Sequence, residues 1–309
     1  MIRGLIPATL TPFTPTGAVD HFALAEHIRH VASATGLYGI AVNGHAGEVL
    51  TLTPLERKEV IVTAKAALPP ALKLIAGIEA HGLDHLVHEG LAAKAAGADM
   101  LLVIPPFDIR VYRHLARDPE TVFNVFQTLE QRVGLPMIVF QYPDASGCSY
   151  SLEALRRIAE LDSVVAIKAS AGAPTQYVVL HDALASKVAL LVASDSPSFL
   201  GMLLHDAPGA LIGISVIDTP RWSTLVREAT EGSAQIAKEL HRDFAVPLMR
   251  SVFEYHLHWT AVCPFGATKE ALRQLNQFPS AWVRPPAVVV NSAKQHEIQV
   301  TLQAIGLLN

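Results

Sequence analysis

Eight short apolar runs, each followed by a turn and by a segment with helical periodicity, constrain the fold of this sequence more than any other feature. Successive runs begin 22 to 37 residues apart, which leaves room for a strand, a helix and two loops in each unit. Many runs are apolar on both sides of the strand, so they are expected to be buried on both faces, as in a parallel sheet covered by helices. The runs are residues 5–9, 38–43, 72–78, 100–105, 137–142, 164–169, 188–193 and 210–215.

Two parallel-sheet architectures fit this alternation, a closed (β/α)8 barrel and an open, doubly wound sheet. Eight units suffice to close a barrel. The open sheet would favour a glycine-rich dinucleotide fingerprint after the first strand, whereas Thr9 is followed by Leu10, Thr11, Pro12 and Phe13. The sequence therefore favours an α/β fold of the TIM-barrel type.

Helix signals support the same layout and extend it beyond the barrel. Thr53, Pro54 and Glu56 form a predicted helix start, and Ser151 caps another. From Asp218 to about residue 294 the pattern is helical without strands, with interruptions predicted at 263–266 and 278–286. We therefore predict a catalytic (β/α)8 barrel at residues 1–230 and a C-terminal helical extension at residues 231–309.

Composition excludes several partners. The net charge of −4 and the absence of Lys or Arg runs argue against nucleic acid, and no apolar stretch of the length of a membrane helix occurs, so a cytoplasmic protein is expected. Cys148 and Cys263 lie far apart without CxxC spacing, and the 14 histidines are scattered, with His256 and His258 spaced wrongly for one helical face. No metal and no cofactor is predicted.

Lys168 is the strongest candidate for chemistry. It comes at the end of the run 164–169, and active sites of such barrels lie where the strands end. Alternation puts Lys168 on the same face as Val164 and Ala166; if that face is the barrel interior, burial lowers the pKa of the amine and makes it a nucleophile for a carbonyl. The competing interpretation is a lysine that has just left the strand and points into water.

Two further segments carry polar groups at strand ends. Residues 43–48 form a turn flanked by Gly44 and Gly47, whose N–H groups can hold a carboxylate, although the glycines also suit any strand-to-helix turn. At the end of the fifth run, Phe140 and Tyr142 share one face. The hydroxyl of Tyr142 is a candidate for binding substrate or moving protons, or belongs to an ordinary core tyrosine.

Taken together, these segments resemble the dihydrodipicolinate synthase and N-acetylneuraminate lyase family of class I aldolases over nearly the whole chain. The turn at 44–48 resembles the family's Gly-x-x-Gly-Glu element, which receives the pyruvyl carboxylate, and Lys168 takes the place of the Schiff-base lysine. The resemblance implies a helical C-terminal extension, no metal or nucleotide, and a homo-oligomer, tetramer or dimer. It implies substrate contacts from Gly44, His45, Ala46, Gly47, Phe140, Ala145, Asp195 and Ile214.

Departures from the family pattern are concentrated around the substrate. Phe140 stands where the family has its catalytic tyrosine, and a phenyl ring cannot relay a proton; Tyr142 or His45 is expected to replace it. Ala145 stands where the lysine-biosynthetic synthases have an arginine that binds the aldehyde's carboxylate, and Phe107 borders the same pocket without the paired tyrosines of those synthases. Lost hydrogen bonds of about 0.5 to 3 kcal/mol each make dihydrodipicolinate synthesis improbable.

The sequence thus predicts a Schiff-base lyase or aldolase acting on pyruvate or another small 2-oxo acid, with Lys168, Tyr142 and His45 as catalytic residues. An imine-dependent dehydratase of a sugar-derived 2-oxo acid is the nearest alternative. A second alternative is a protein that binds a 2-oxo acid without turnover, because Phe140 lacks the hydroxyl of the family's catalytic tyrosine.

Overall fold

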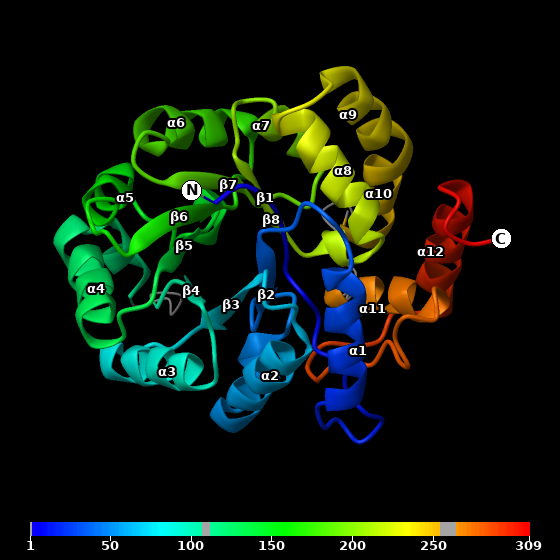
Figure 1. The fold of residues 1–309 in the computed structure, drawn as a ribbon, viewed down its shortest axis with the longest axis horizontal. Coiled ribbons are helices and arrows are strands. Elements are labelled where there is room, and N and C mark those ends of the chain that lie inside the picture. Colours follow the sequence, from blue (N-terminus) through cyan, green and yellow to red (C-terminus); the bar gives the residue numbers. More distant parts are fainter. Residues whose placement is uncertain (1, 107–111, 254–263) are drawn as a thin grey trace.

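The computed structural model describes residues 2–106, 112–253 and 264–309, and in them eight parallel strands form one sheet that curves into a barrel (Figure 1). The predicted α/β TIM-barrel fold is confirmed, and each predicted apolar run overlaps a strand. The strands are β1 (Gly4–Pro7), β2 (Gly39–Val42), β3 (Lys73–Ile78), β4 (Met100–Val103), β5 (Met137–Gln141), β6 (Val164–Ala169), β7 (Ala189–Val192) and β8 (Gly209–Ile212).

The barrel closes between its first two strands. The sheet order runs from β1 through β8 and back to β2, so β1 and β2 are its two edges. Parallel bridges pair Leu5 with Leu37 and Ala8 with Ala41, and the N–H of Thr9 donates to the carbonyl of Ala41 over 2.8 Å. These contacts satisfy backbone groups that an open edge would leave unpaired.

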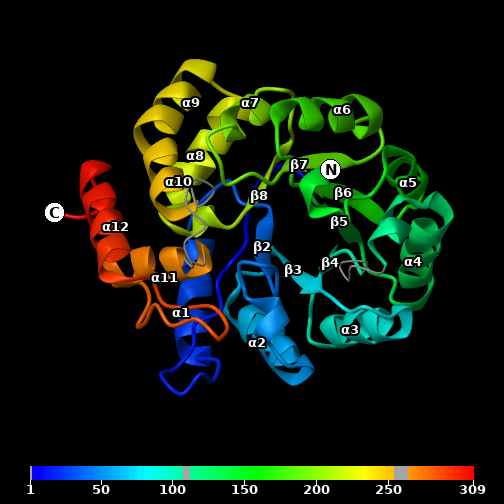
Figure 2. The ribbon, with the colours of Figure 1, turned by 180° about the vertical axis from the view of Figure 1, so that it is seen from behind.

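Helices alternate with the strands and surround them (Figure 2). The predicted helix starts at Thr53 and Ser151 are confirmed: Thr53 and Glu56 form a reciprocal capping box, and the Ser151 side chain accepts from Ala154 N. The barrel helices are α1 (His21–Ala32), α2 (Pro54–Ala67), α3 (Leu83–Ala95), α4 (Pro119–Arg132), α5 (Leu152–Ile158), α6 (Pro174–Leu184), α7 (Phe199–Leu203) and α8 (Thr219–Thr230).

The helices that follow α8 are α9 (Ala234–Leu240), α10 (Val246–Phe253), α11 (Pro264–Gln274) and α12 (Ser292–Ala304), with a π-helical turn, η5 (His241–Ala245), between α9 and α10. α9 packs against α8, while α12 packs against α10 and α11 at the edge of the molecule (Figures 1 and 2). The interruption predicted at 278–286 is confirmed by the non-helical chain between α11 and α12. The interruption predicted at 263–266 is wrong for residues 264–266, which are helical and belong to α11. Cys263, His256 and His258 lie outside the described residues.

The strands are buried almost throughout, as their apolar runs predict. Strand interiors such as Met137, Ile138 and Val139 are fully buried between the barrel core and the helices. Within the described ranges, no helix combines the length and the apolarity that crossing a membrane requires.

Candidate active site

Lys168 lies at the carboxyl end of β6, paired in register with Phe140 of β5 and Leu191 of β7. Its side chain is partly buried, and its Nζ lies 3.7 Å from the centroid of the Phe140 ring, over the ring face. Burial lowers the pKa of Lys168 from 10.5 to about 8, because a charged amine loses solvation there, while the carboxylate of Asp195 acts in the opposite direction. The amine therefore faces the barrel mouth and not open water.

Asp195 follows β7 and is fixed by the end of β8. Its Oδ1 accepts a hydrogen bond of 3.0 Å from the N–H of Ile214, and the N–H of Gly213 also bonds it. Burial raises the pKa of Asp195, although these N–H groups and Lys168 favour its charged form. Burial thus shifts the amine and the carboxyl toward their neutral forms in the same part of the barrel mouth.

Three rings gather beside Lys168. The Phe140 ring centroid lies 5.1 Å from that of His45 and 4.8 Å from that of Tyr142. The Tyr142 hydroxyl and His45 Nε2 are 2.7 Å apart, a hydrogen bond whose direction depends on the imidazole tautomer. The structure therefore brings together all three residues predicted to carry catalysis, from β6, the end of β5 and the turn after β2.

The turn after β2 is held by its own backbone. The N–H of Gly47 donates to the carbonyl of Gly44 over 3.1 Å, and the N–H of Glu48 donates to that of His45 over 2.9 Å. Thr11 Oγ1 donates to the Gly47 carbonyl over 2.8 Å, which ties the turn to the segment after β1. The N–H of Ala46 donates no hydrogen bond to any part of the chain that the structure describes. The N–H of Ala46 is therefore able to donate a hydrogen bond to a substrate carboxylate.

Close backbone approach sets the position of this turn. A Cβ on Gly77 of β3 would lie 1.9 Å from the Asn43 carbonyl oxygen, so the end of β2 reaches its place only because residue 77 is glycine. On the other side, a Cβ on Gly213 would lie 3.3 Å from the Ala46 side chain. The turn therefore meets the end of β8, next to the N–H that holds Asp195.

The remaining predicted residues fall in different places. Ala145 is exposed on the short 3-10 helix η3 (Asp144–Ser146), after the strand that carries Phe140. Phe107 lies outside the described residues.

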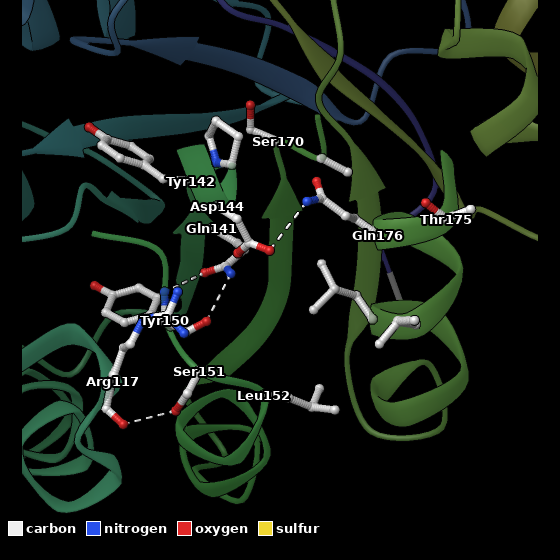
Figure 3. Close-up of a pocket in the computed structure, with 14 residues that line it drawn as sticks. Arg117, Gln141, Tyr142, Asp144, Tyr150, Ser151, Leu152, Ser170, Thr175 and Gln176 are labelled. Atoms are coloured by element: carbon white, nitrogen blue, oxygen red, sulfur yellow. Dashed lines mark hydrogen bonds between the residues drawn. The ribbon is translucent and has the colours of Figure 1, made fainter. Parts of the chain in front are cut away.

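Two cavities open at the strand ends. One of about 410 Å³ is bordered by Tyr142, Asp144 and Gln176, and the amide of Gln176 bonds the Asp144 carboxylate over 3.2 Å. Figure 3 shows the ring of Tyr142 extending away from Gln176. The other, of about 320 Å³, is lined by Asp195 together with Ser170, Ser196, Met249 and Phe253, among others.

The sequence did not predict that helices after the barrel reach this site. Met249 and Phe253 of α10 line the smaller cavity, and Lys269 of α11 forms an ion pair with Glu48 at the end of the turn. Nothing local in the sequence signals these contacts, because the α10 residues are simply apolar and Lys269 lies 221 positions from its partner Glu48.

A group able to ligate a metal lies elsewhere. His181, Asp182 and His205 have ligand atoms within 4.8 Å of one another, the first two on α6 and the third in the turn after α7. His181 borders a cavity shared with Arg3 and Pro208, next to the amino ends of the strands, so this group is at the opposite end of the barrel from Lys168.

Comparison with known proteins gives a consistent result. The sequence model described as the Dihydrodipicolinate synthetase family matches residues 1–305. The 4-hydroxy-tetrahydrodipicolinate synthase of Methanothrix thermoacetophila is 28% identical over 255 residues, which cover 82% of each chain. Among solved structures, the chloride-inhibited dihydrodipicolinate synthase of Acinetobacter baumannii complexed with pyruvate has a TM-score of 0.86 at 24% identity over 100% of both chains. N-acetylneuraminate lyase from Fusobacterium nucleatum has a TM-score of 0.84 at 19% identity over 99% of both chains.

Proposed function

Because this chain belongs to the dihydrodipicolinate synthetase family, whose members include lyases of the class I aldolase type, we propose that it is an imine-forming lyase of a small 2-oxo acid. The single observation that carries the proposal is the Lys168 amine at the mouth of the barrel, with a pKa lowered by burial to about 8. At pH 7 about one amine in ten is then uncharged, against fewer than about one in a thousand for an ordinary lysine.

The chemistry that Lys168 supports begins with attack of the amine lone pair on the keto carbon. The keto oxygen takes up two protons, one from the attacking amine and one from an acid, and its loss as water leaves a protonated imine. That cation withdraws electrons from the neighbouring carbon, so a C–H or C–C bond there can break to give an enamine, which can then expel a hydroxyl group from the next carbon along. The face of the Phe140 ring, 3.7 Å from Nζ, is placed to stabilise the cation.

Proton transfer in these steps is assigned to His45 and Tyr142. Their 2.7 Å hydrogen bond makes one acid–base unit next to the Phe140 ring, where the family's tyrosine hydroxyl is missing. This pair favours an active enzyme over a protein that only binds a 2-oxo acid, because binding alone needs no such unit.

The carboxylate of the 2-oxo acid is assigned to the turn at residues 44–48. The N–H of Ala46 is a donor there, and the dihydrodipicolinate synthase of Acinetobacter baumannii, which shares the fold, holds pyruvate. Pyruvate or a substituted pyruvate is therefore the first substrate we propose.

The second substrate is proposed to differ from the aldehyde of dihydrodipicolinate synthesis. Ala145 offers no guanidinium for a carboxylate, and the cavity beside Asp195 combines serine hydroxyls with the apolar Met249 and Phe253. Aldehydes with and without a carboxylate, each offered together with pyruvate, test whether the second substrate carries a carboxylate. Preferential use of a carboxylate-bearing aldehyde would contradict the proposal that it does not. Product analysis then separates C–C bond formation or cleavage from loss of water.

Reduction with borohydride in the presence of pyruvate tests the imine. The expected result is a stable mass increase located on Lys168 by peptide mapping, absent from Lys168→Ala. A protein that stays unmodified with pyruvate and with longer 2-oxo acids would refute the proposal.

Assembly into a dimer or tetramer is proposed as well. Leu50 and Leu55, each 63% exposed, offer apolar contact area for it, and analytical sedimentation measures the oligomeric state.

A further inference from the structure

A buried ion pair links the C-terminal helices to the turn that carries His45. Lys269 of α11 bonds the Glu48 carboxylate, and the two side chains are 0% and 4% exposed. Lys269 Nζ also donates to the Trp282 carbonyl over 3.0 Å, and the backbone N–H of Arg284 donates to the other Glu48 oxygen over 3.1 Å. The carboxylate is thus fixed from two points of the chain after the barrel.

Glu48 in turn fixes the backbone of the turn. Its φ is 55°, in the left-handed region that costs a non-glycine residue energy, and its N–H donates to the His45 carbonyl over 2.9 Å. Its own carbonyl accepts from the N–H of Thr51 over 2.8 Å, at the end of the 3-10 helix η1 (Val49–Thr51). A side chain anchored at both oxygens holds this conformation in place.

Arg284 completes the attachment on the other side of η1. Its guanidinium donates to the Thr51 carbonyl over 2.7 Å and forms a two-pronged ion pair with Glu56, in the first turn of α2. The hydrogen bond from Arg284 is the main reason that the pKa of Glu56 falls to about 2, so this pair is charged at neutral pH. The chain from residue 48 to residue 56 is therefore clamped at both ends by the segment after α11.

We infer that Lys269 is a positioning residue, which holds His45 at hydrogen-bond distance from Tyr142 through Glu48. Stability alone gives no reason for the pair, because apolar side chains of similar volume often serve as well in a core. The position of the ion pair gives a reason for it, because the backbone N–H of Glu48 bonds the carbonyl of His45. A shift of about 1 Å in a catalytic group can slow a reaction by about 100-fold. This inference rests on the proposed function.

Exchange of the pyruvate methyl protons in D2O isolates the step that needs His45. The imine at Lys168 loses a C3 proton to the enzyme's base, the enamine takes up a deuteron from solvent, and hydrolysis returns labelled pyruvate. NMR follows this exchange without any second substrate, and borohydride trapping separately measures the imine.

The test variant is Lys269→Met combined with Glu48→Gln, which removes both charges and keeps an acceptor for the Arg284 N–H. We expect trapping within about twofold of the unaltered protein and exchange slower by about 10- to 100-fold. Adding His45→Gln to this variant should lower exchange only to the level of His45→Gln alone, because both changes act through the same imidazole.

Arg221→Met is the matched control, since Arg221 joins α8 to the Ile305 carbonyl and lies away from the turn. It should leave trapping and exchange unchanged. Exchange that persists in the double variant, losses that multiply with His45→Gln, or loss of trapping along with exchange would each overturn the positioning role. An unaltered protein that neither traps nor exchanges would instead refute the proposed function.

Discussion

The reactive amine should cost the protein stability, and Lys168→Met measures that cost. Burial lowers the pKa of Lys168 from 10.5 to about 8. At about 1.4 kcal/mol per unit, the charged amine destabilises the folded state by about 3 kcal/mol at pH 7. Contact of Nζ with the Phe140 ring returns about 0.5 to 1 kcal/mol of this. Methionine has a similar volume and no charge, so we expect it to raise the free energy of unfolding by about 2 to 3 kcal/mol.

The pH range of this effect follows from the direction of the shift. Below pH 8 the amine is protonated in both states, and the whole cost is present. Between pH 8 and 10.5 the folded state releases its proton while the unfolded state keeps one, so folding becomes more favourable as pH rises. Above pH 10.5 both states are neutral. The advantage of Lys168→Met should therefore be full at pH 7 and should fade toward pH 10.

Urea unfolding of both proteins at pH 7, 8, 9 and 10 gives the comparison. Lys187→Met is the control, because Lys187 lies on the surface with half of its side chain exposed, and it should change stability by no more than about 0.5 kcal/mol at any pH. Equal stability of Lys168→Met and the unaltered protein at pH 7, or a gain that does not depend on pH, would contradict burial of a charged amine.

Three further predictions concern single groups. Asp195→Asn keeps an acceptor for the Ile214 N–H but removes the charge that raises the pKa of Lys168, so the pH at half-maximal imine trapping should fall below its value near 8; an unchanged midpoint would mean that the two groups do not interact. Tyr142→Phe should leave trapping intact and slow exchange of the pyruvate methyl protons by about 100-fold or more, and undiminished exchange would remove the hydroxyl from the mechanism. Burial lowers the pKa of His27 to about 3, so stability should fall by about 2 kcal/mol between pH 6.5 and pH 5, as the unfolded imidazole takes up a proton and the folded one does not; in urea unfolding His27→Leu should lack this decline.

The barrel could be predicted from the sequence because its information is local. Each strand is a short apolar run, and helix starts such as Thr53 and Ser151 use capping side chains within three residues of their partners. The interruption predicted at 263–266 is wrong for residues 264–266, because Pro264 is typical of a helix break, although proline is also tolerated in the first turn of a helix.

The sequence predicts those site residues whose positions are determined by the ends of the barrel strands. Phe140 and Lys168 lie near the carboxyl ends of neighbouring strands and Asp195 follows the next one, so barrel topology brings them together. Contacts from the C-terminal helices could not be predicted, because Lys269 meets Glu48 only through the packing of α11 against the barrel. Ion pairs across 221 residues leave no periodic or motif signal in a single sequence.

Under the proposed function, Phe140 and Tyr142 together show how an enzyme that resembles this family could dispense with its usual tyrosine. The two residues share a face of the strand end, so a hydroxyl moved from one to the other stays on the same side of Lys168, nearer the barrel mouth. Nε2 of His45, on the turn proposed to receive the carboxylate, lies 2.7 Å from that hydroxyl. Phe140 keeps the place next to the amine, where its ring face favours a cation such as the protonated imine. In the proposed mechanism, acid–base work and cation stabilisation, which one tyrosine can combine, are divided between two side chains. A proton relay on the side of the barrel mouth would act on the imine from there, so we expect substrates that carry bulky groups at the mouth to be selected by their fit against Tyr142 and His45.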